Sequence, residues 1–584
     1  MMLHQLSWKV GGQQGEGIDS TGEIFASALN RKGYYLYSYR HFSSRIKGGH
    51  TNNKIRVSTK KIHTITDELD ILVAFDQETI DVNAHELNEQ GVVVADAKFK
   101  PKLSENCPAK LYAVPFTEIA KELGNTLMKN MVAIGASAAL LGLKVDDFKP
   151  VVQEIFAKKG NEVVELNLKA IQAGFRYIIE HFEGDLTTFK LAEADGKTRM
   201  FMIGNDAISL GAIAAGVRFM AAYPITPASE IMEFLTKKLP EFGGAVIQTE
   251  DEMAAVMMAI GANYAGARAF TASAGPGLSL MMESIGLAGM TETPLVIVDT
   301  QRGGPSTGLP TKQEHSDLLQ MIYGTHGEIP KIVIAPSTAE EAFYDTVQAF
   351  NLAEIYQCPV ILLSDLQLSL SKQTVEPFNF EKVKIDRGKL VTEVDKGDSK
   401  DYFKRYELTE DGISPRVLPG TKNGIHHVTG VEHDETGKPS EAPKNRKAQM
   451  EKRMRKLNTV ISRFHEPVFI NGEKDADILF VGFNSTRGAI EEAAEQLKRE
   501  GLKVTHAHVR LLHPFPAELL KPYIESATRV IVVENNYSGQ LAQLLKLNVG
   551  FAEKISHIGK YDGTPFLPKD VYVKTKELVP IGNV

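Results

Sequence analysis

Three short motifs between residues 223 and 277 contain residue types that bind anions and move protons. The first is the Tyr-Pro-Ile-Thr-Pro sequence at residues 223–227. Tyr223 and Thr226 each precede a proline, which favours extended backbone at both positions. Pro227 suits the first position of a helix over residues 227–238, with Thr226 as its N-cap. Such a helix start offers N–H groups and a hydroxyl to an anion, although an ordinary capped helix explains these residues better when they are taken alone.

The second motif is a run of three acids, Glu250, Asp251 and Glu252, followed by an Ala/Met/Gly-rich segment at residues 253–261. A helix that is apolar nearly all round is expected to be buried. A carboxylate at its buried end, with Glu250 as the candidate, needs a partner or a raised pKa. The alternative is that the acids are exposed and interact with the helix dipole, which is plausible for Asp251 and Glu252.

The third motif is a Thr-Ala-Ser-Ala-Gly-Pro-Gly sequence at residues 271–277, which precedes an apolar helix predicted over residues 278–290. Gly275, Pro276 and Gly277 lie where a strand would turn into this helix. Small residues at such a turn allow a second backbone or a cofactor to approach closely. A plain strand-to-helix turn remains the alternative.

The elements that must position these motifs are those of α/β structure. Residues 1–183 form a first predicted α/β domain, with a strand at 6–10, a glycine-rich turn at 11–17, a helix at 22–32 and further strands at 71–75 and 91–95. Short apolar runs separated by helical stretches are typical of parallel sheets. A polar linker is expected at 184–199.

A second α/β domain is predicted over residues 200–370, with buried strands at 269–273, 295–299, 332–335 and 360–363. Residues 371–475 are polar and charged, and we expect a solvated connector or arm with a basic helix at 445–457. A third domain is expected over 476–584. It has strands at 478–483 and 529–533 and a helix at 488–500, which ends before Gly501.

Composition excludes several classes of protein. The 584 residues carry a net charge of −7 with scattered Lys and Arg, so nothing indicates a nucleic-acid binder. The sequence contains two cysteines, Cys107 and Cys358. They exclude a disulfide framework and a cluster or zinc site built by this chain alone. No secretory signal and no apolar run of about 18 residues is present, so we expect a cytoplasmic chain without a membrane span.

Taken together, the three motifs resemble the pyrimidine-binding (PYR) domain of thiamine-diphosphate enzymes, in which an acid precedes the glycine turn; here Gly275 follows Glu250 by 25 residues. The 223–227 motif and residues 298–311 (Val-Asp-Thr-Gln-Arg-Gly-Gly-Pro-Ser-Thr-Gly-Leu-Pro-Thr) resemble the alpha subunit of 2-oxoacid:ferredoxin oxidoreductases. The resemblance continues through residues 513–516 and 534–541, and it implies a third domain similar to the C-terminal domain of transketolase.

The first domain is similar to the gamma subunit of the same family, fused in front of the alpha part. The Gly-Gly-Gln-Gln-Gly sequence at residues 11–15 and the Ser-Arg-Ile-Lys-Gly-Gly-His-Thr sequence at 44–51 carry this similarity. The gamma–alpha order favours the 2-oxoglutarate type.

This resemblance implies roles for particular residues. Glu250 would contact N1′ of the aminopyrimidine ring and promote deprotonation of the thiazolium C2, which is general acid–base work. Thr226 and Arg302 would bind the carboxylate of the 2-oxoacid, with Tyr223 beside them, and residues 275–277 would line the cofactor. The alternative for Arg302 is an ion pair with Asp299.

The family also implies parts that this chain lacks. The sequence contains no Gly-Asp-Gly, the start of the motif that binds the diphosphate through a divalent metal. Mg²⁺ and a [4Fe–4S] cluster are therefore expected in a beta subunit, with the active site between subunits and an αβ or (αβ)₂ assembly. Coenzyme A and ferredoxin are the expected co-substrate and electron acceptor.

Two weaker patterns stay open. The glycines Gly12, Gly15 and Gly17 do not have the spacing of a dinucleotide-binding fingerprint. A loop that binds the phosphates of coenzyme A is as plausible as a structural turn. The histidines His426, His427 and His433 resemble metal ligands in composition, but surface histidines explain them better, and we expect no metal bound by this chain.

The reaction implied by the resemblance is the oxidative decarboxylation of a 2-oxoacid, with 2-oxoglutarate favoured. Acyl transfer to coenzyme A and reduction of ferredoxin complete it. Pyruvate, branched-chain 2-oxoacids and indolepyruvate are alternative substrates. A non-catalytic scaffold that binds coenzyme A or a nucleotide is an alternative of another class.

Overall fold

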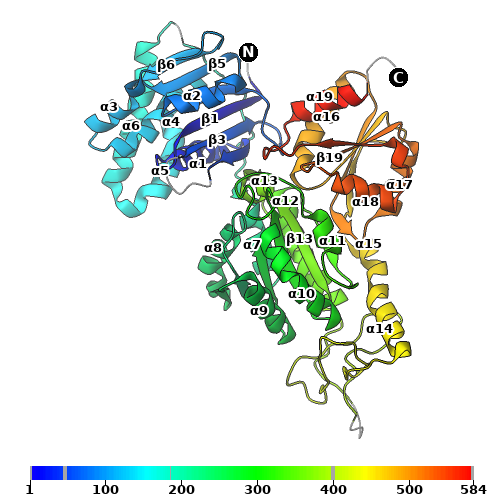
Figure 1. Cartoon of the computed structure of the whole chain (residues 1–584). Helices are drawn as coiled ribbons and strands as arrows, with labels where there is room; N and C mark the ends of the chain where they lie inside the picture. The colour runs from blue at the N-terminus through cyan, green and yellow to red at the C-terminus, as the bar shows by residue number, and fades with distance from the viewer. Residues whose placement is uncertain (1–2, 44–48, 185, 396–400, 580–584) are drawn as a thin grey trace. The chain divides into compact units, whose positions relative to one another are not determined.

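The structure is a computed structural model, which describes residues 3–43, 49–184, 186–395 and 401–579. The described chain divides into two compact units (Figure 1). The first contains residues 1–202, 370–377 and 567–569, and the second contains the rest. Residues 44–48 of the motif at 44–51 lie outside the described residues. Among the described residues, the helices are all too short or too polar to cross a membrane.

The sheet of the first unit has the strand order β6-β5-β4-β1-β3-β2-β14-β7. β1 pairs in parallel with β4 and antiparallel with β3, so the sheet is mixed and not wholly parallel as expected. The antiparallel β2–β3 pair was absent from the prediction. The strands are β1 (Gln5–Gln13), β2 (Tyr35–His41), β3 (His50–Ser58), β4 (Leu69–Ala74), β5 (Leu87–Asp96), β6 (Lys110–Val114), β7 (Met200–Ile203) and β14 (Lys372–Val375).

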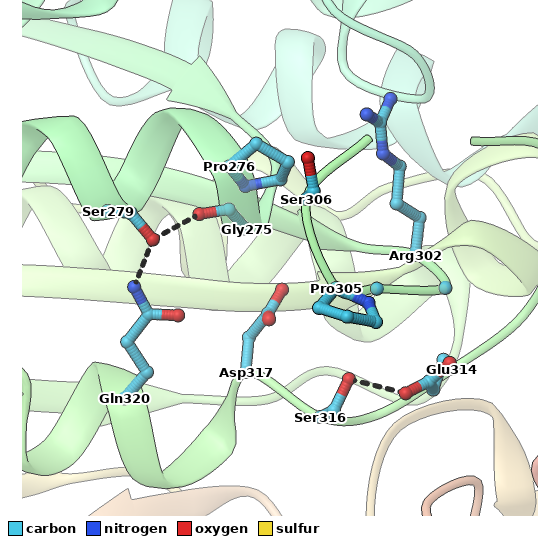
Figure 2. A pocket seen from close by; sticks show the side chains of 12 residues that line it. Gly275, Pro276, Ser279, Arg302, Pro305, Ser306, Glu314, Ser316, Asp317 and Gln320 are labelled. Carbon is cyan, nitrogen blue, oxygen red and sulfur yellow. Dashed lines mark hydrogen bonds between the residues drawn. The ribbon is translucent and has the colours of Figure 1, made fainter. Parts of the chain in front are cut away.

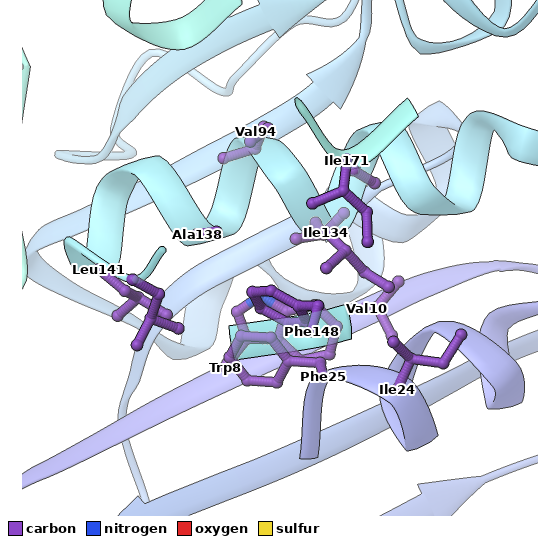
Figure 3. Close-up of a cluster of buried hydrophobic side chains, with 14 of the residues drawn as sticks. Trp8, Val10, Ile24, Phe25, Val94, Ile134, Ala138, Leu141, Phe148 and Ile171 are labelled. Carbon is purple, nitrogen blue, oxygen red and sulfur yellow. The ribbon is translucent and has the colours of Figure 1, made fainter. Parts of the chain in front are cut away.

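Helices pack on this sheet around an aromatic core (Figure 3). The rings of Trp8 on β1 and Phe25 on α1 stack with centroids 4.2 Å apart, and Phe148 lies beside them. Gly135 and Gly174 bring α4 and α6 together, because a Cβ at Gly174 would lie 2.0 Å from the carbonyl oxygen of Val132. The helices are α1 (Ile18–Arg31), α2 (Gln77–Asn83), α3 (Phe116–Glu122), α4 (Lys129–Leu141), α5 (Lys149–Phe156) and α6 (Asn161–His181).

The central sheet of the second unit has the order β18-β12-β13-β11-β10-β8-β9. Its strands run parallel except β18, so the carboxyl ends of β10 and β11 lie at the same edge. The predicted buried strands are confirmed here, since short apolar runs suit a sheet that is covered on both faces. The strands are β8 (Phe219–Ala222), β9 (Ala245–Gln248), β10 (Ala269–Ser273), β11 (Leu295–Gln301), β12 (Ile332–Ile334), β13 (Pro359–Asp365) and β18 (Leu511–His513).

Within this part, α7 packs against α12 and α9 packs against α10. The apolar segments at 253–261 and 278–290 are helical as expected. The helices are α7 (Gly204–Ala214), α8 (Ser229–Lys238), α9 (Glu252–Tyr264), α10 (Gly275–Met290), α11 (Leu318–Tyr323), α12 (Ala339–Tyr356) and α13 (Leu366–Leu370).

A smaller sheet with the order β15-β17-β16-β19-β20 forms the C-terminal part of the second unit. Strand β18, which the sequence places in the third domain, instead joins the edge of the central sheet, and one hydrophobic core is common to both. The helix that was predicted at 488–500 is confirmed as α16, and Gly501 follows it with φ 94°. The elements are β15 (Val468–Asn471), β16 (Ile478–Gly482), β17 (Val504–Val509), β19 (Arg529–Glu534), β20 (Ile555–Gly559), α16 (Arg487–Arg499), α17 (Ala517–Ser526), α18 (Gln540–Asn548) and α19 (Pro568–Leu578).

The polar segment at residues 371–475 is less solvated than its composition suggests. Its first strand, β14, belongs to the sheet of the first unit. The basic helix is α14 (Pro443–Arg455), and α15 (Val460–Arg463) follows it. Lys452 and Lys456 are fully buried and bind the two carboxylate oxygens of Glu292 at 2.6 and 2.7 Å. The expectation of a solvated arm is wrong here, because this buried acid pairs with the basic side chains.

Candidate active site

A cavity of about 530 Å³ opens at the carboxyl ends of β10 and β11 in the second unit (Figure 2). It lies where the first turn of α10, which begins at Gly275, meets the loop that follows β11. This is the usual position of a ligand site in a parallel α/β sheet. The lining residues are Gly275, Pro276, Ser279, Arg302, Gly303, Gly304, Pro305, Ser306, Glu314, Ser316, Asp317 and Gln320.

Arg302 follows β11 directly and is only 7% exposed. Its Nη1 donates a hydrogen bond of 2.6 Å to the backbone carbonyl of Thr226, and its Nε has no partner. Burial lowers the pKa of Arg302, while Asp317 raises it. The alternative ion pair with Asp299 does not form, because neither carboxylate oxygen of Asp299 has a partner among the described residues.

The segment of Thr226 differs from its prediction. α8 begins at Ser229, and its N-cap is Ala228, which makes no side-chain capping bond. The predicted Thr226 cap is therefore wrong. The physical reason is that long-range partners hold the preceding backbone: Arg302 binds the carbonyl of Thr226, and the Asn205 amide donates to the carbonyl of Pro227 at 2.7 Å.

Tyr223 and Thr226 do not line the cavity with their side chains. Tyr223 is 40% exposed, and Thr226 is half-buried. The structure therefore brings Thr226 to Arg302 through the backbone, and Tyr223 is not among the lining residues.

The three acids before α9 occupy three different environments. Glu250 is exposed, Asp251 caps the helix by accepting a hydrogen bond of 2.7 Å from the N–H of Ala254, and Glu252 is only 8% exposed. The alternative of an exposed Glu252 is wrong, because the first turn of α9 packs against the first turn of α10. Helix α9 is also not buried all round, since Met253 and Met257 are exposed.

Glu252 lies beside the predicted glycine turn. A Cβ at Gly277 would lie 2.0 Å from Oγ of Ser273 and 3.0 Å from Oε1 of Glu252. A Cβ at Gly275 would lie 2.7 Å from the carboxylate oxygens of Asp317. Both glycines therefore make room for polar side chains, which explains the small residues of this turn.

Sequence reasoning missed Asp317. Its carboxylate points into the cavity between Gly275 and the loop of Pro305 (Figure 2). Burial raises the pKa of Asp317 to about 7, and the nearby Glu314 adds to the effect. The available signal was the Glu-His-Ser-Asp run at residues 314–317, immediately before α11.

The glycine loop of the first unit is partly filled by its own acid. Gly12 lies within β1 and not in a turn. Oε2 of Glu16 accepts a hydrogen bond of 3.0 Å from the N–H of Gln13, and Oε1 binds Lys129 at 2.6 Å. Gly15 and Gly17 have positive φ angles of 99° and 80°, which a turn requires. This arrangement supports the structural alternative for the loop.

The histidines of the polar segment bind backbone groups. Nδ1 of His426 lies 2.8 Å from the carbonyl of Gly424, and Nδ1 of His433 lies 2.9 Å from that of Val431. The ring of His427 packs at a tilt against an aromatic ring of the same segment. Over the described ranges, no group of three or more His, Cys, Asp or Glu side chains has a geometry suited to a metal ion.

Comparisons with protein families match three segments of the chain. Residues 210–452 match the family described as "Pyruvate flavodoxin/ferredoxin oxidoreductase, thiamine diP-bdg". Residues 7–177 match "Pyruvate ferredoxin/flavodoxin oxidoreductase", and residues 476–571 match "Pyruvate:ferredoxin oxidoreductase core domain II".

Individual proteins are similar over the whole length. A 2-oxoacid:ferredoxin oxidoreductase subunit alpha from Saccharolobus solfataricus is 34% identical, and the match covers 99% of this chain and 98% of that protein. The 2-oxoglutarate oxidoreductase subunit KorA of Mycobacterium tuberculosis is 32% identical, over 97% and 91%. The solved 2-oxoglutarate:ferredoxin oxidoreductase of Magnetococcus marinus is 37% identical with a TM-score of 0.92, covering 98% of this chain and 99% of that one.

A thiamine-diphosphate-binding domain between two further α/β domains defines a class of oxidoreductase subunits that act on 2-oxoacids. The chain belongs to the 2-oxoacid:ferredoxin oxidoreductase family, as an alpha subunit that carries a gamma-type domain at its N-terminus. The predicted family and fold class are confirmed. The relatives are named as alpha subunits, which implies a partner subunit.

Proposed function

We propose that this subunit acts in the oxidative decarboxylation of 2-oxoglutarate, with transfer of the acyl group to coenzyme A and of electrons to ferredoxin. The similar Magnetococcus marinus structure is described with 2-oxoglutarate, coenzyme A and succinyl-CoA bound. The Mycobacterium tuberculosis relative is named for 2-oxoglutarate. Pyruvate is the second candidate substrate, because the matching family descriptions name it.

The observation that carries this proposal is the position of Arg302 on the cavity wall, beside the turn at residues 275–277. A guanidinium offers two parallel N–H donors that match a carboxylate. Nη1 is already bound to Thr226, which fixes the direction of the guanidinium plane. We infer that the donors left for an anionic substrate are Nε, which is buried without a partner in this structure, and Nη2, whose bond to the carbonyl oxygen of Thr307 is long at 3.5 Å.

The residues around Gly277 fit thiamine diphosphate. Oγ1 of Thr271 and Oγ of Ser273 are buried without partners, and Gly277 leaves open the space that a Cβ would fill between Ser273 and Glu252. When bound, thiamine diphosphate supplies a nucleophilic carbon that attacks the ketone of the 2-oxoacid. The protein must hold a proton-exchanging carboxylate against the ring nitrogen.

Glu250 or Glu252 is the carboxylate in this role. The family motif indicates Glu250, and its role stays a prediction. The Glu252 side chain has low exposure and lies beside the Cβ position of Gly277, next to Ser273. This favours Glu252, since a general acid–base group must lie within hydrogen-bond reach of the atom with which it exchanges a proton. Glu250 is exposed in the isolated chain and would need a partner chain to cover it.

A beta subunit should supply the parts that this chain lacks. We infer that it carries the diphosphate site with Mg²⁺ and the [4Fe–4S] cluster, and that it passes electrons to ferredoxin. The absence of a Gly-Asp-Gly sequence and the two cysteines of the chain support this inference. An αβ or (αβ)₂ assembly with the active site between subunits follows. The role of Gly12, Gly15 and Gly17 in binding coenzyme A stays a weaker proposal, given the position of Glu16.

The test is a substrate profile of the complex assembled from this chain and its beta subunit. We expect coenzyme-A-dependent reduction of ferredoxin with 2-oxoglutarate at a higher kcat/KM than with pyruvate, branched-chain 2-oxoacids or indolepyruvate. A preference for pyruvate would replace the substrate assignment. A complex inactive with every 2-oxoacid, although loaded with thiamine diphosphate, would instead support the scaffold alternative.

A further inference from the structure

The Glu-Asn-Asn-Tyr-Ser-Gly-Gln-Leu sequence at residues 534–541 carries part of the family resemblance but has no role in the site described so far. It links β19 to α18 in the C-terminal part of the second unit. The residues that line the cavity all belong to the segment from residue 275 to residue 320. The structure nevertheless connects the two regions, because residues 535–540 bind residues 315–319 of the cavity wall.

Gln540 is the first residue of α18, and its side-chain amide holds the cavity wall at two points. Its Nε2 donates a hydrogen bond of 2.8 Å to the carbonyl oxygen of Ser316, and its Oε1 accepts one of 2.9 Å from the N–H of Leu319. Leu319 is the second residue of α11, and the N-cap of that helix, Asp317, makes no side-chain capping bond. Gln540 therefore satisfies an N–H group that the first turn of a helix leaves unpaired.

His315, at the start of the same wall segment, is held in a similar way. Its N–H donates a hydrogen bond of 2.7 Å to the carbonyl oxygen of Asn535, and its carbonyl oxygen accepts one of 3.0 Å from Nδ2 of Asn536. All three residues are at most 1% exposed. Buried backbone groups need partners, and these partners come from the end of a strand in another sheet.

Glu534 fixes the position from which these amides act. Its carboxylate is fully buried and accepts hydrogen bonds from Nδ2 of Asn536 at 2.7 Å and from the N–H groups of Leu541 and Ala542 at 2.8 and 3.1 Å. A buried carboxylate is stable with such donors, and the start of a helix favours a negative charge. Gly539, the N-cap of α18, has a φ of 69°, a conformation that favours glycine.

The wall segment is held through its backbone, while its side chains face the cavity. Ser316, Asp317 and Gln320 are lining residues. Nε2 of Gln320 donates a hydrogen bond of 2.8 Å to Oγ of Ser279, which in turn donates one of 3.2 Å to the carbonyl oxygen of Gly275 (Figure 2). The contacts therefore continue from α18 through α11 to the first residue of α10.

We propose that Asn536 and Gln540 are positioning residues for the 2-oxoacid site. They act through the backbone of residues 315–319 and place the side chains of this segment in the cavity that Arg302 also lines. The C-terminal part of the second unit thereby sets the shape of a cavity whose lining residues come earlier in the chain. The identity of the ligand rests on the proposed function, whereas the hydrogen bonds that hold the wall do not.

The first experiment uses the purified full-length chain and does not depend on activity. In Gln540→Ala, hydrogen exchange of peptides covering residues 315–324 should become faster by roughly fivefold or more, the effect of about one neutral hydrogen bond. Peptides covering residues 478–482 of β16 should be unchanged. Exchange of residues 315–324 at the wild-type rate would overturn the proposal.

Gln543→Ala on the same helix is the matched control. The side-chain amide of Gln543 donates a hydrogen bond of 2.9 Å to the carbonyl oxygen of Ser538, and Gln543 is exposed. The substitution therefore removes an amide from α18 without removing a bond to the cavity wall. Exchange of residues 315–324 should match that of the wild type, and an acceleration equal to that in Gln540→Ala would overturn the specific role of Gln540.

The second experiment measures steady-state kinetics of the assembled complex. In Gln540→Ala, KM for 2-oxoglutarate should rise roughly fivefold or more, while KM for coenzyme A stays at the wild-type value and kcat falls less. Gln540→Glu keeps the acceptor for the N–H of Leu319 but loses the donor to Ser316. Its KM for 2-oxoglutarate should therefore lie between those of the wild type and Gln540→Ala, and Gln543→Ala should match the wild type.

The kinetic outcomes separate positioning from ordinary packing between the two sheets. A variant that only contains fewer folded molecules has a lower kcat at an unchanged KM, and this result in Gln540→Ala would overturn the proposal. If the complex does not use 2-oxoglutarate but uses pyruvate, the substrate assignment fails. The same rise of KM for pyruvate in Gln540→Ala would still support the positioning role.

Discussion

Nη1 of Arg302 donates a hydrogen bond of 2.6 Å to the backbone carbonyl oxygen of Thr226, 76 residues earlier in the chain. This bond joins the Tyr-Pro-Ile-Thr-Pro motif to the loop that follows β11. It uses the backbone carbonyl of Thr226, whereas the sequence indicated the Thr226 hydroxyl as a donor to the substrate carboxylate. Thr226 therefore orients Arg302, and Arg302 is the side chain that reaches the cavity.

The first prediction concerns Arg302→Lys. Lysine keeps the positive charge but loses the planar donor pair and cannot bind both Thr226 and a carboxylate. We expect KM for the 2-oxoacid to rise roughly tenfold or more, since hydrogen bonds to charged groups contribute about 1.5–3 kcal/mol. The kcat should fall less, because the carboxylate leaves as CO₂ and its binding is similar in the ground and transition states.

Thr226→Val is the matched variant for this prediction. It keeps the carbonyl that Arg302 binds and removes only a neutral hydroxyl, which is worth about 0.5–1.5 kcal/mol at most. Steady-state kinetics of both variants should therefore show a smaller rise of KM for Thr226→Val. An unchanged KM in Arg302→Lys for every 2-oxoacid tested would place the substrate carboxylate elsewhere.

The second prediction distinguishes Glu252 from Glu250. In the assembled complex, hydrogen–deuterium exchange at C2 of thiamine diphosphate should slow by about 10²-fold or more in Glu252→Gln, since an amide cannot exchange the proton. Glu250→Gln is the matched substitution two residues away and should change the exchange rate much less. The opposite order would assign the role to Glu250, as the family motif suggests.

The sequence was sufficient wherever local pattern decides structure. Strands such as β10 and β13 are short apolar runs, and their burial on both faces follows from composition. The start of α8 was not predictable, because Asn205 and Arg302 hold the preceding backbone from distant positions. Asp317 was missed for a related reason, since only the folded chain brings it to Gly275.

The third prediction concerns Glu292, the buried acid after α10 that pairs with two lysines of the polar segment. Burial alone would raise the pKa of Glu292, but Lys452 and Lys456 hold this pKa well below its ordinary range. Glu292→Gln would leave two buried ammonium groups without a counter-charge, which costs about 3–5 kcal/mol. We expect residues 401–465 to be cleaved faster by trypsin at low protease concentration, where the rate follows the population of the open form.

Glu451→Gln on α14, the helix that contains Lys452, is the control for this substitution. Glu451 is exposed and lies 3.9 Å from Lys447, a surface pair that contributes less than about 1 kcal/mol. Its cleavage rate should match that of the wild type. Equal rates for Glu292→Gln and Glu451→Gln would show that the buried pairs do not hold this segment in place.

The fourth prediction concerns pH and Asp365, at the end of β13. Its carboxylate accepts hydrogen bonds from Oγ of Ser485 at 2.6 Å and from the N–H of Leu368 at 2.7 Å, and it lies 2.7 Å from Nε2 of His315. Burial raises the pKa of Asp365, but these partners lower it further, so the net shift is downward. A depressed carboxyl pKa contributes stability above about pH 4, which is lost as pH falls through the folded pKa.

Asp365→Asn should therefore destabilise the region around Ser485 by roughly 2–3 kcal/mol at pH 7, and the difference from wild type should shrink below about pH 4. Hydrogen exchange of peptides covering residues 478–490 measures this directly. Fluorescence is unsuitable, because the only tryptophan, Trp8, lies in the first unit. A difference that stays constant from pH 7 to pH 3 would mean that the charge of Asp365 contributes nothing.

The last prediction is that the purified chain alone reduces no dye with any 2-oxoacid and shows no iron–sulfur absorbance. A [4Fe–4S] cluster requires four thiolate ligands. Cys107 and Cys358 lie in different units, and burial raises the pKa of Cys358 to about 12, which disfavours its thiolate. Addition of the beta subunit should restore both signals, while a complex containing Arg302→Lys should regain the absorbance with a raised KM. Activity from the single chain would show that the electron acceptor and the diphosphate site do not come from a partner.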